Sequence, residues 1–251
     1  MTTPAIDSLP AWLREAIQNP PPPPDPVEVA QAERRARRAE AGAIRDRLPG
    51  FLAAPKLHEL EQRIASPGML SLAREWSPRT HGNAVLLGET GQGKSTAAAV
   101  VFRRLLQHGW RDGGEAWAFA RGMRWCRAEQ LEREMRAHPM GKGECPAFRD
   151  AVNASLLVLD ELGWERDPKG IASVLAERYD SPRLTIVTSG QTLRQLSEAY
   201  GAAVVRRMLT HGSRQPTIVE AFPTRDEQRR AQVLAGNRPS SDQDELDRRY
   251  P

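Results

Sequence analysis

The sequence predicts an α/β fold, in which a parallel five-stranded sheet is flanked by helices on both faces. Two observations carry this prediction. Short apolar segments alternate with segments of helical periodicity between residues 83 and 222. A glycine-rich segment also connects the first of these apolar segments directly to a helical one, as parallel sheets of this class require.

The expected elements follow in order along the chain. Helices are predicted over 27–48, a polar segment that Pro49 and Gly50 end, and over 57–65. The predicted strands are 83–87, 116–120, 155–159, 184–188 and 217–220. The predicted helices between them are 94–108, 128–137, 171–179 and 193–208, the last continuing past Gly201.

Residues 1–50 form a predicted N-terminal extension, ahead of an α/β domain at 51–222 and a polar C-terminal tail at 223–251. The extension begins with a short amphipathic helix over 9–17, followed by five prolines at 20–24 that favour an extended spacer. Two interpretations stay open: a solvated, partly disordered segment, or a tethered peptide that docks on a partner through Trp12 and Leu13.

Composition excludes several classes of protein. Of 251 residues 39% are hydrophobic and 27% charged, which is enough for one core and too polar for a membrane protein. The N-terminus lacks the pattern of a secretory signal, and two cysteines exclude a disulfide scaffold. We therefore expect a cytoplasmic protein without a membrane partner. The net charge of +4 permits binding of nucleic acid, although the arginine excess is equally explained by genomic base composition.

Residues 88–95, Gly-Glu-Thr-Gly-Gln-Gly-Lys-Ser, match the phosphate-loop pattern G-x-x-x-x-G-K-[ST]. The glycines let backbone N–H groups face phosphate oxygens, Lys94 reaches the β- and γ-phosphates, and the Ser95 hydroxyl is a ligand for Mg²⁺. The chain has only four lysines, and one of them falls at this position. The candidate nucleotide-binding residues are Gly88, Glu89, Thr90, Gly91, Gln92, Gly93, Lys94, Ser95 and Thr96.

Asp160 and Glu161 end the most apolar predicted strand. In a chain with a phosphate loop, Asp160 is the candidate second ligand for Mg²⁺. Glu161 is placed to orient and deprotonate an attacking water, which favours hydrolysis of ATP over transfer of phosphate to a metabolite. The sequence thus predicts a P-loop ATPase with ATP and Mg²⁺ as cofactors.

Two further positions carry candidate catalytic residues. Thr188 and Ser189 end the next predicted strand, where a hydroxyl either contacts the γ-phosphate and the attacking water or merely caps the following turn. Arg206 and Arg207 end the helix before the last strand. An arginine there either reaches a neighbouring subunit's γ-phosphate or interacts with its own helix terminus.

Together these motifs resemble the AAA+ ATPases of the DnaC/IstB type, the helicase-loader group of bacteria and phages. The resemblance covers about residues 83–222 and rests on four segments. These are the phosphate loop, Leu-Asp-Glu-Leu-Gly at 159–163, Arg-Tyr at 178–179 ahead of Pro-Arg-Leu-Thr-Ile-Val-Thr-Ser at 182–189, and Val-Val-Arg-Arg-Met at 204–208. The short chain after the last strand also fits this group, which carries no substantial lid domain.

The resemblance implies slow ATP hydrolysis that a partner or DNA stimulates, and subunits that assemble with ATP at their interfaces. It identifies Arg207 as the arginine finger and assigns residues 1–50, by position alone, to a replicative helicase. The chain departs from the family at Gly190, where asparagine is usual, so that Thr188 or Ser189 takes the sensor role or the role is weakened.

Single-stranded DNA is the second partner that the resemblance implies, facing the stretch between the second and third strands. Arg121, Arg124 and Arg127 alternate here with Trp125, a pattern suited to phosphate attraction and base stacking. The alternative is the solvated start of a helix, with Trp125 packed into the core.

We expect an ATP-dependent protein of DNA replication that loads a helicase on single-stranded DNA. Two alternatives remain at this level. A transposition helper ATPase of the IstB type shares the same chemistry, and a nucleotide-switched scaffold would show negligible hydrolysis.

Overall fold

The computed structural model describes residues 25–139, 141–181, 183–210 and 214–223, together with Pro10, Ala11 and Glu15. The helix predicted at 9–17, apart from those three residues, lies outside this part of the chain. So do the proline spacer at 20–24 and the tail after Pro223.

Five parallel strands form the centre of the protein, in the order β2-β3-β4-β1-β5. The strands are β1 (Ala84–Gly88), β2 (Arg124–Arg127), β3 (Leu156–Leu162), β4 (Leu184–Ser189) and β5 (Thr217–Ala221). Because all strands run in one direction, their carboxyl ends meet along a single edge, where ligands bind in open α/β sheets. The predicted fold class is confirmed.

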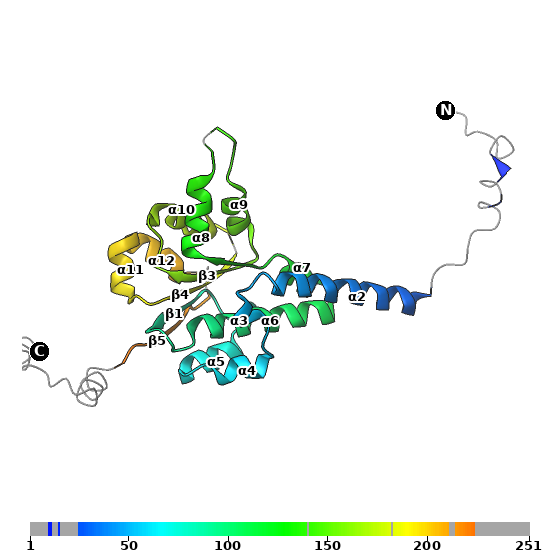
Figure 1. Cartoon of the computed structure of the whole chain (residues 1–251), viewed down its shortest axis with the longest axis horizontal. Helices are drawn as coiled ribbons and strands as arrows, with labels where there is room; N and C mark the ends of the chain where they lie inside the picture. Colours follow the sequence, from blue (N-terminus) through cyan, green and yellow to red (C-terminus); the bar gives the residue numbers. More distant parts are fainter. Residues whose placement is uncertain are drawn as a thin grey trace, which may run out of the picture.

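Helices cover both faces of this sheet (Figure 1). Those on one face are α2 (Pro26–Arg45), α3 (Gly50–Ala53), α4 (Leu57–Gln62), α5 (Pro67–Glu75), α6 (Lys94–Asp112) and α7 (Gly114–Arg121). Those on the other face are α8 (Ala128–Ala137), α9 (Pro146–Asn153), α10 (Pro168–Tyr179), α11 (Leu193–Tyr200) and α12 (Ala202–Leu209). Among these residues, no helix is long and apolar enough to cross a membrane.

Two hydrophobic cores result from the alternation of side chains along the strands. In β1, Ala84 and Leu86 belong to the core beneath α6, whereas Val85 and Leu87 belong to the core beneath α10. Every residue of β1 is buried, as expected for a strand in the interior of a parallel sheet. The central strands are therefore fixed from both sides, and the loops at their ends are held by a rigid base.

α2 runs along α6 with its C-terminal half in the core and its N-terminal half extended beyond the body of the protein (Figure 1). Asp25 caps its first turn by accepting a hydrogen bond from the N–H of Val27 at 2.8 Å, and Pro26 occupies the first helical position. Ala41 and Ile44 are the buried residues of this helix.

The structure corrects the sequence prediction in the region between α6 and α8. Residues 116–120, predicted as a strand, belong to helix α7, and the edge strand β2 lies instead at Arg124–Arg127, where the sequence left the start of a helix open as an alternative. Three short helices, α3, α5 and α9, had no counterpart among the predicted elements.

The helix predicted over 193–208 is also two helices, α11 and α12. Gly201, at a φ of 86°, ends α11 and redirects the chain, because this left-handed conformation is favourable for glycine and interrupts helical geometry. The break gives α12 its own direction, so that Val205 and Met208 reach the core.

Candidate nucleotide-binding site

The loop between β1 and α6 has the backbone of an anion-binding loop. Gly93 lies at a φ of 90° directly before α6, and a Cβ there would come within 2.8 Å of the Ile64 Cα. Gly88 ends β1 so close to β5 that a Cβ would lie 2.5 Å from the Ala221 carbonyl oxygen. Both glycines of the G-x-x-x-x-G-K-[ST] pattern are thus required by close packing, and α6 begins where its N-terminal N–H groups face the loop.

Lys94 and Ser95 form the first turn of α6. The Nζ of Lys94 donates to the carbonyl oxygens of Gly88 and Glu89, each at 2.7 Å, which holds the ammonium group over the loop. Burial lowers the pKa of Lys94, with Asp160 and Glu161 opposing the shift. A partly desolvated ammonium beside two carboxylates is suited to contact a phosphate group.

Asp160 joins three elements at the carboxyl end of the sheet. Its Oδ1 accepts hydrogen bonds from the Ser95 hydroxyl of α6 at 2.6 Å and from the Thr188 hydroxyl of β4 at 2.7 Å. The carboxylate is buried, with 1% of the residue exposed. The structure thus brings together Lys94, Ser95, Asp160 and Thr188, which lie up to 94 residues apart in the sequence.

Glu161 has a strained backbone. Its φ of 60° is the one positive value among the non-glycine residues that the structure describes, and its N–H donates to the Thr188 hydroxyl at 3.0 Å. This conformation turns the carboxylate to the exposed side of the sheet edge, where Arg127 Nε lies 3.6 Å from Oε2. Strain that persists at a carboxylate beside a phosphate loop is typical of a functional position.

The hydroxyl of Ser189 points away from this cluster. It donates to the carbonyl oxygen of Leu162 at 2.6 Å and accepts from the N–H of Gln191 at 3.0 Å. The Gln191 Nε2 in turn donates to the carbonyl of Gly163 at 3.2 Å. Of the two hydroxyls that the sequence left as alternatives, only Thr188 bonds to Asp160. Ser189 instead ties the end of β4 to the loop after β3.

A groove of about 570 Å³ opens beside these groups. Its lining includes Gly91, Lys94, Ser95, Thr96 and Glu161, together with the exposed Trp164. The volume lies within the range of about 300–1,000 Å³ typical of small-ligand sites. The groove is therefore large enough for a nucleotide, and the phosphate loop forms part of its lining.

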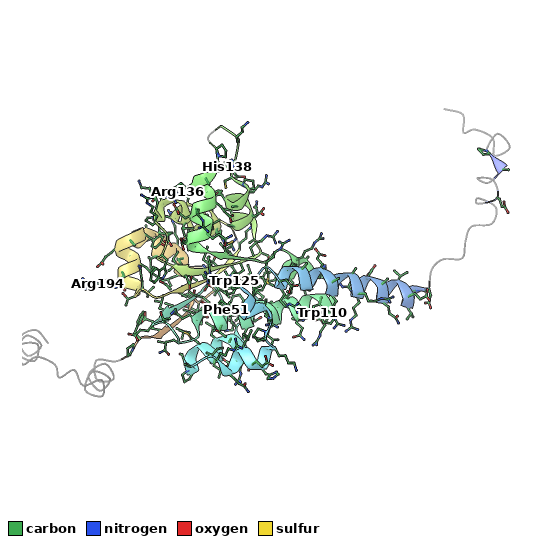
Figure 2. All side chains as sticks on the ribbon, viewed as in Figure 1. Phe51, Trp110, Trp125, Arg136, His138 and Arg194 are labelled. Carbon is green, nitrogen blue, oxygen red and sulfur yellow. The ribbon has the colours of Figure 1, made fainter. Side chains whose placement is uncertain are left out.

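Two lining residues, Phe51 and Arg63, had no counterpart among the predicted site residues. Phe51 is 55% exposed on the short helix α3 (Figure 2), and Arg63 donates from Nη1 to the Phe51 carbonyl at 3.3 Å. They lie 25 and 37 residues before Gly88, the first residue of the loop, and no local motif marks them. Their place in the groove suits contact with the base of a nucleotide, by stacking on Phe51 and by hydrogen bonds from Arg63.

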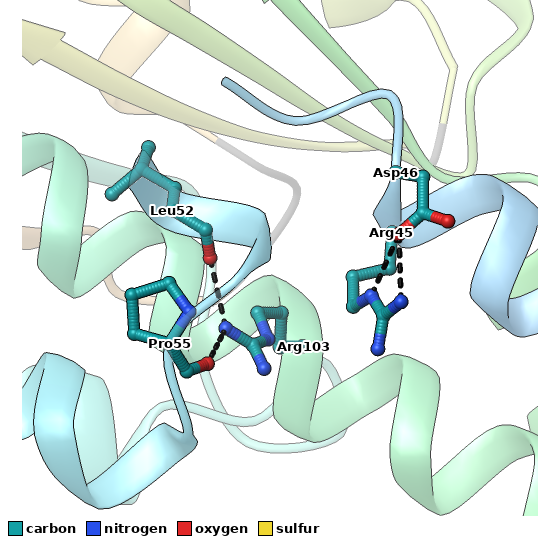
Figure 3. Close-up of polar contacts among 5 residues, drawn as sticks. All are labelled: Arg45, Asp46, Leu52, Pro55 and Arg103. Atoms are coloured by element: carbon teal, nitrogen blue, oxygen red, sulfur yellow. Dashed lines mark hydrogen bonds and ion pairs between the residues drawn. The ribbon is translucent and has the colours of Figure 1, made fainter. Parts of the chain in front are cut away.

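Arg103 fixes the segment that carries Phe51. From α6, its Nη1 donates to the carbonyl oxygens of Leu52 at 2.8 Å and Pro55 at 2.6 Å (Figure 3). These bonds hold the turn between α3 and α4 against α6, whose first turn carries Lys94 and Ser95. The two walls of the groove are thus joined through one helix.

The oxygen donors present fit a magnesium ion bound together with a nucleotide. Mg²⁺ prefers oxygen ligands, keeps several waters, and is typically held in nucleotide sites by one or two protein oxygens and the substrate phosphates. The Ser95 hydroxyl and the Asp160 carboxylate supply such a pair beside the loop. Among the residues that the structure describes, no group of three or more His, Cys, Asp or Glu side chains forms a metal cage.

Arg207 does not reach this groove within the chain. Arg207 is on α12, and its guanidinium lies 5.8 Å from the ring centroid of Tyr179, the last residue of α10. Arg206 beside it is exposed. The lining residues of the groove do not include either arginine.

The residues of the Arg121–Arg127 stretch lie in two different places in the structure. Arg124, Trp125 and Arg127 line a separate groove of about 570 Å³ along the edge strand β2, whereas Arg121 pairs with Glu40 of α2 at 2.8 Å. The indole of Trp125 (Figure 2) packs edge-on against Phe102, with ring centroids 6.2 Å apart. Its Nε1 is buried without a hydrogen-bond partner.

Comparison with solved structures identifies proteins of the same fold. The crystal structure of DnaI aligns over 68% of this chain and 94% of its own, with 16% sequence identity and a TM-score of 0.52. The chain is similar in fold to DnaI. This likeness confirms the fold that the sequence resemblance implied.

Two further structures align less well. The DnaC helicase loader covers 60% of this chain and 85% of its own at 20% identity, with a TM-score of 0.43. AMPPCP-bound DnaA from Aquifex aeolicus covers 72% and 55% at 17% identity, with a TM-score of 0.47. No protein-family model and no curated protein sequence matches the chain.

Proposed function

We propose that this protein binds ATP with Mg²⁺, hydrolyses it, and uses this cycle in the cytoplasm to load a replicative helicase onto single-stranded DNA. One observation carries the proposal: the buried Asp160 carboxylate accepts hydrogen bonds from Ser95 and Thr188, and Ser95 lines a nucleotide-sized groove together with Lys94. The DnaI-like fold is consistent with it.

Each residue at this edge of the sheet then has a separate task. The backbone from Gly88 to Thr96 binds the phosphates, and Lys94 balances their charge. Ser95 and Asp160 hold Mg²⁺, which when bound neutralises charge on the phosphates. The Glu161 carboxylate orients the attacking water and accepts its proton, while Thr188 fixes the positions of both acidic residues.

Stimulation by DNA has a structural route in this proposal. Arg127 at the end of β2 pairs with Glu161 at 3.6 Å and lines the same groove as Arg124 and Trp125. A DNA phosphate that binds Arg127 competes for this guanidinium and frees the Glu161 carboxylate to act as a base. Hydrolysis would then be slow in the free protein and faster on DNA.

Self-assembly and the helicase contact complete the proposal. Arg207 has no contact with its own nucleotide groove, so it is available to act on the γ-phosphate of a neighbouring subunit. Residues 1–50, including the projecting half of α2, are proposed to bind the helicase. An Arg207→Ala variant should still bind ATP as a monomer, and should lose turnover only under conditions where subunits assemble.

ATP turnover by the full-length protein, with and without single-stranded DNA, tests the proposal. We expect slow hydrolysis that rises several-fold on adding oligothymidylate, and a further change when a hexameric replicative helicase is added. A variant lacking residues 1–24 should keep the DNA response and lose the helicase response. Absence of nucleotide binding, or of DNA binding in every nucleotide state, would refute the function.

A further inference from the structure

A second groove, of about 410 Å³, lies between α2, α4 and α6. Four of its lining side chains are cationic, and among the described residues no aspartate or glutamate lines it. The cationic residues are Arg38 and Arg45 from α2, Lys56 before α4, and Arg103 from α6. The nucleotide groove has a different set of lining residues.

Trp110 extends this cationic surface toward the C-terminus of α6. The guanidinium groups of Arg34 and Arg38 each lie 5.7 Å from the centroid of its ring, and that of Arg111 lies 5.4 Å away. Trp110, labelled in Figure 2, is itself one of the lining residues of the groove. One aromatic ring thus gathers three arginines, since guanidinium groups stack favourably on indole faces.

The positive charge of the groove is largely unbalanced by the protein. The Arg103 Nη1 is bonded to two backbone carbonyls, which carry no net charge. Within the part of the chain that the structure describes, Arg45 is the one cation of the groove with an acidic partner, Asp46 at 2.7 Å (Figure 3). Burial and the nearby Arg45 both lower the pKa of Arg103. Two acids of α2 are already paired elsewhere, Glu33 with Arg37 and Glu40 with Arg121.

We infer that this groove binds the sugar–phosphate backbone of a single nucleic-acid strand. Arg34, Arg38 and Arg45 follow one another at intervals of four and seven residues, which places them along α2 over about 16 Å. Guanidinium groups match phosphate oxygens in bidentate geometry, and a line of them suits a polyanion rather than an isolated ion. The volume fits a few groups of one strand and is too small to enclose a duplex.

Two other polyanions suit the groove less well. A lipid surface needs exposed apolar anchors around the charges, whereas Ala41 and Leu106 in this lining are buried. For an acidic protein segment, no neighbouring surface gives a path that would continue its binding site beyond the groove. For a nucleic-acid strand there is such a path, because Arg47, two residues after Arg45, lines the groove along β2 where we place DNA. The inference goes beyond the proposed function by extending the strand from β2 along α2 and α6.

A pair of charge-matched variants of the full-length protein tests this inference. The groove variant is Arg38→Ala with Arg45→Ala and Lys56→Ala. The control is Arg35→Ala with Arg166→Ala and Lys169→Ala, which removes the same two arginines and one lysine from exposed positions outside the groove. Fluorescence anisotropy with a labelled 20-nucleotide oligothymidylate, at several salt concentrations, measures affinity and the number of phosphate contacts.

We expect the groove variant to bind the oligonucleotide at least about tenfold more weakly, and its log–log salt slope to fall by about two, at about 0.7 per lost contact. The control should change affinity by less than about threefold. ATP affinity and the circular dichroism melting curve, measured on all three proteins, should be unchanged, which separates this test from failure of the nucleotide site.

Equal losses in the two variants would overturn the inference, because net charge alone would then explain binding. So would unchanged binding by the groove variant. Poly-glutamate and phosphatidylserine vesicles are measured in parallel. Loss of either of these interactions with retention of oligothymidylate binding would also overturn the inference, in favour of an acidic protein or a lipid surface.

Discussion

The two ends of the central strands both bury polar side chains, but with different partners. At the carboxyl end, Asp160 receives the hydroxyls of Ser95 and Thr188, and these contacts connect side chains of three separate elements. Glu161 adds a strained backbone at the same place. At the amino end, Asn83 and Arg178 donate almost entirely to backbone carbonyl groups.

Arg178 is the centre of the amino-end network. Only 2% of it is exposed, and its guanidinium donates to the carbonyls of Ala151, Val152, Ala154 and Leu184, and from Nε to the Thr185 hydroxyl at 3.0 Å. Burial lowers the pKa of Arg178 to about 9, so the group is still a cation at neutral pH. All three guanidinium nitrogens donate hydrogen bonds within the protein, so the group is tied to the fold.

The difference distinguishes a closed polar network from an open one. Arg178 donates hydrogen bonds to carbonyl groups that would otherwise be buried without partners, and this stabilises the fold. Lys94 and Glu161 instead line a groove in which a ligand can contact their charges, and Asp160 is hydrogen-bonded to Ser95 of the same lining. The amino end should therefore control stability, and the carboxyl end nucleotide binding and turnover.

Replacing Arg178 with methionine should give the largest effect. The variant leaves several buried carbonyls and the Thr185 hydroxyl without a donor, so we expect a loss of about 3–5 kcal/mol in the free energy of unfolding. Urea denaturation followed by circular dichroism measures it. Arg183→Met is the control, because Arg183 donates one bond to Val152 from a less buried position and should cost about 1 kcal/mol or less. Similar losses in both variants would contradict the closed network.

Lys94→Ala tests the other end of the sheet. We expect ATP to bind about 100-fold more weakly, or about 2.7 kcal/mol, with an unchanged melting temperature, because the ammonium faces the loop rather than the core. Isothermal titration calorimetry with MgATP measures the affinity. Lys142→Ala removes a lysine from an exposed loop position and should leave affinity unchanged. Tight ATP binding by Lys94→Ala would show that the loop does not hold phosphate.

The two threonines of β4 allow the same substitution at both ends. Thr188→Val removes the hydroxyl that links Asp160 with the Glu161 N–H, and should lower kcat about tenfold or more by freeing both acids. Thr185→Val removes only the acceptor of Arg178 Nε, and should lower stability by about 1 kcal/mol with kcat unchanged. Steady-state ATPase assays and denaturation of both variants decide the comparison. Equal kcat values for the two variants would remove the distinction between the ends.

The smallest expected effect is a dependence of ATP binding on pH. Because burial lowers the pKa of Lys94, its ammonium group in the free protein loses a proton at a pH below the ordinary lysine pKa of about 10.4. Bound phosphate favours the ammonium form, so binding takes up a proton there and affinity falls as the pH rises. Calorimetry in two buffers of different ionisation enthalpy measures the uptake. The Lys94→Ala variant should show none, and equal uptake by both proteins would assign it elsewhere.

The part of this picture that the sequence predicted is local or deeply buried. The phosphate loop and the Asp160–Glu161 pair are contiguous motifs, and β1, β3 and β4 are apolar because both their faces are covered. β2 was misplaced because Arg-Trp-Cys-Arg is an edge strand paired on one side only, with polar and half-buried side chains. The alanine-rich α7 alternates in a way that resembles a strand.

The features that the sequence did not predict depend on contacts between segments that are distant in the chain. The sequence could not choose between Thr188 and Ser189, because the choice depends on which face of β4 meets Asp160. Arg178 contributed only to a family resemblance, since its carbonyl partners lie 24 to 27 residues before it and six after it. Phe51 and Arg63 join the groove through packing of α3 and α4 on α6, which no short motif encodes.

The central claim is that the carboxyl end of the sheet is a hydrolytic site in which Glu161 acts as the base. Glu161→Gln keeps the size and position of the side chain and removes its proton-accepting charge. Measured side by side for MgATP affinity and single-turnover hydrolysis, this variant should bind ATP within about threefold of the unaltered protein and hydrolyse it at least about 100-fold more slowly. Hydrolysis at the unaltered rate would contradict the claim.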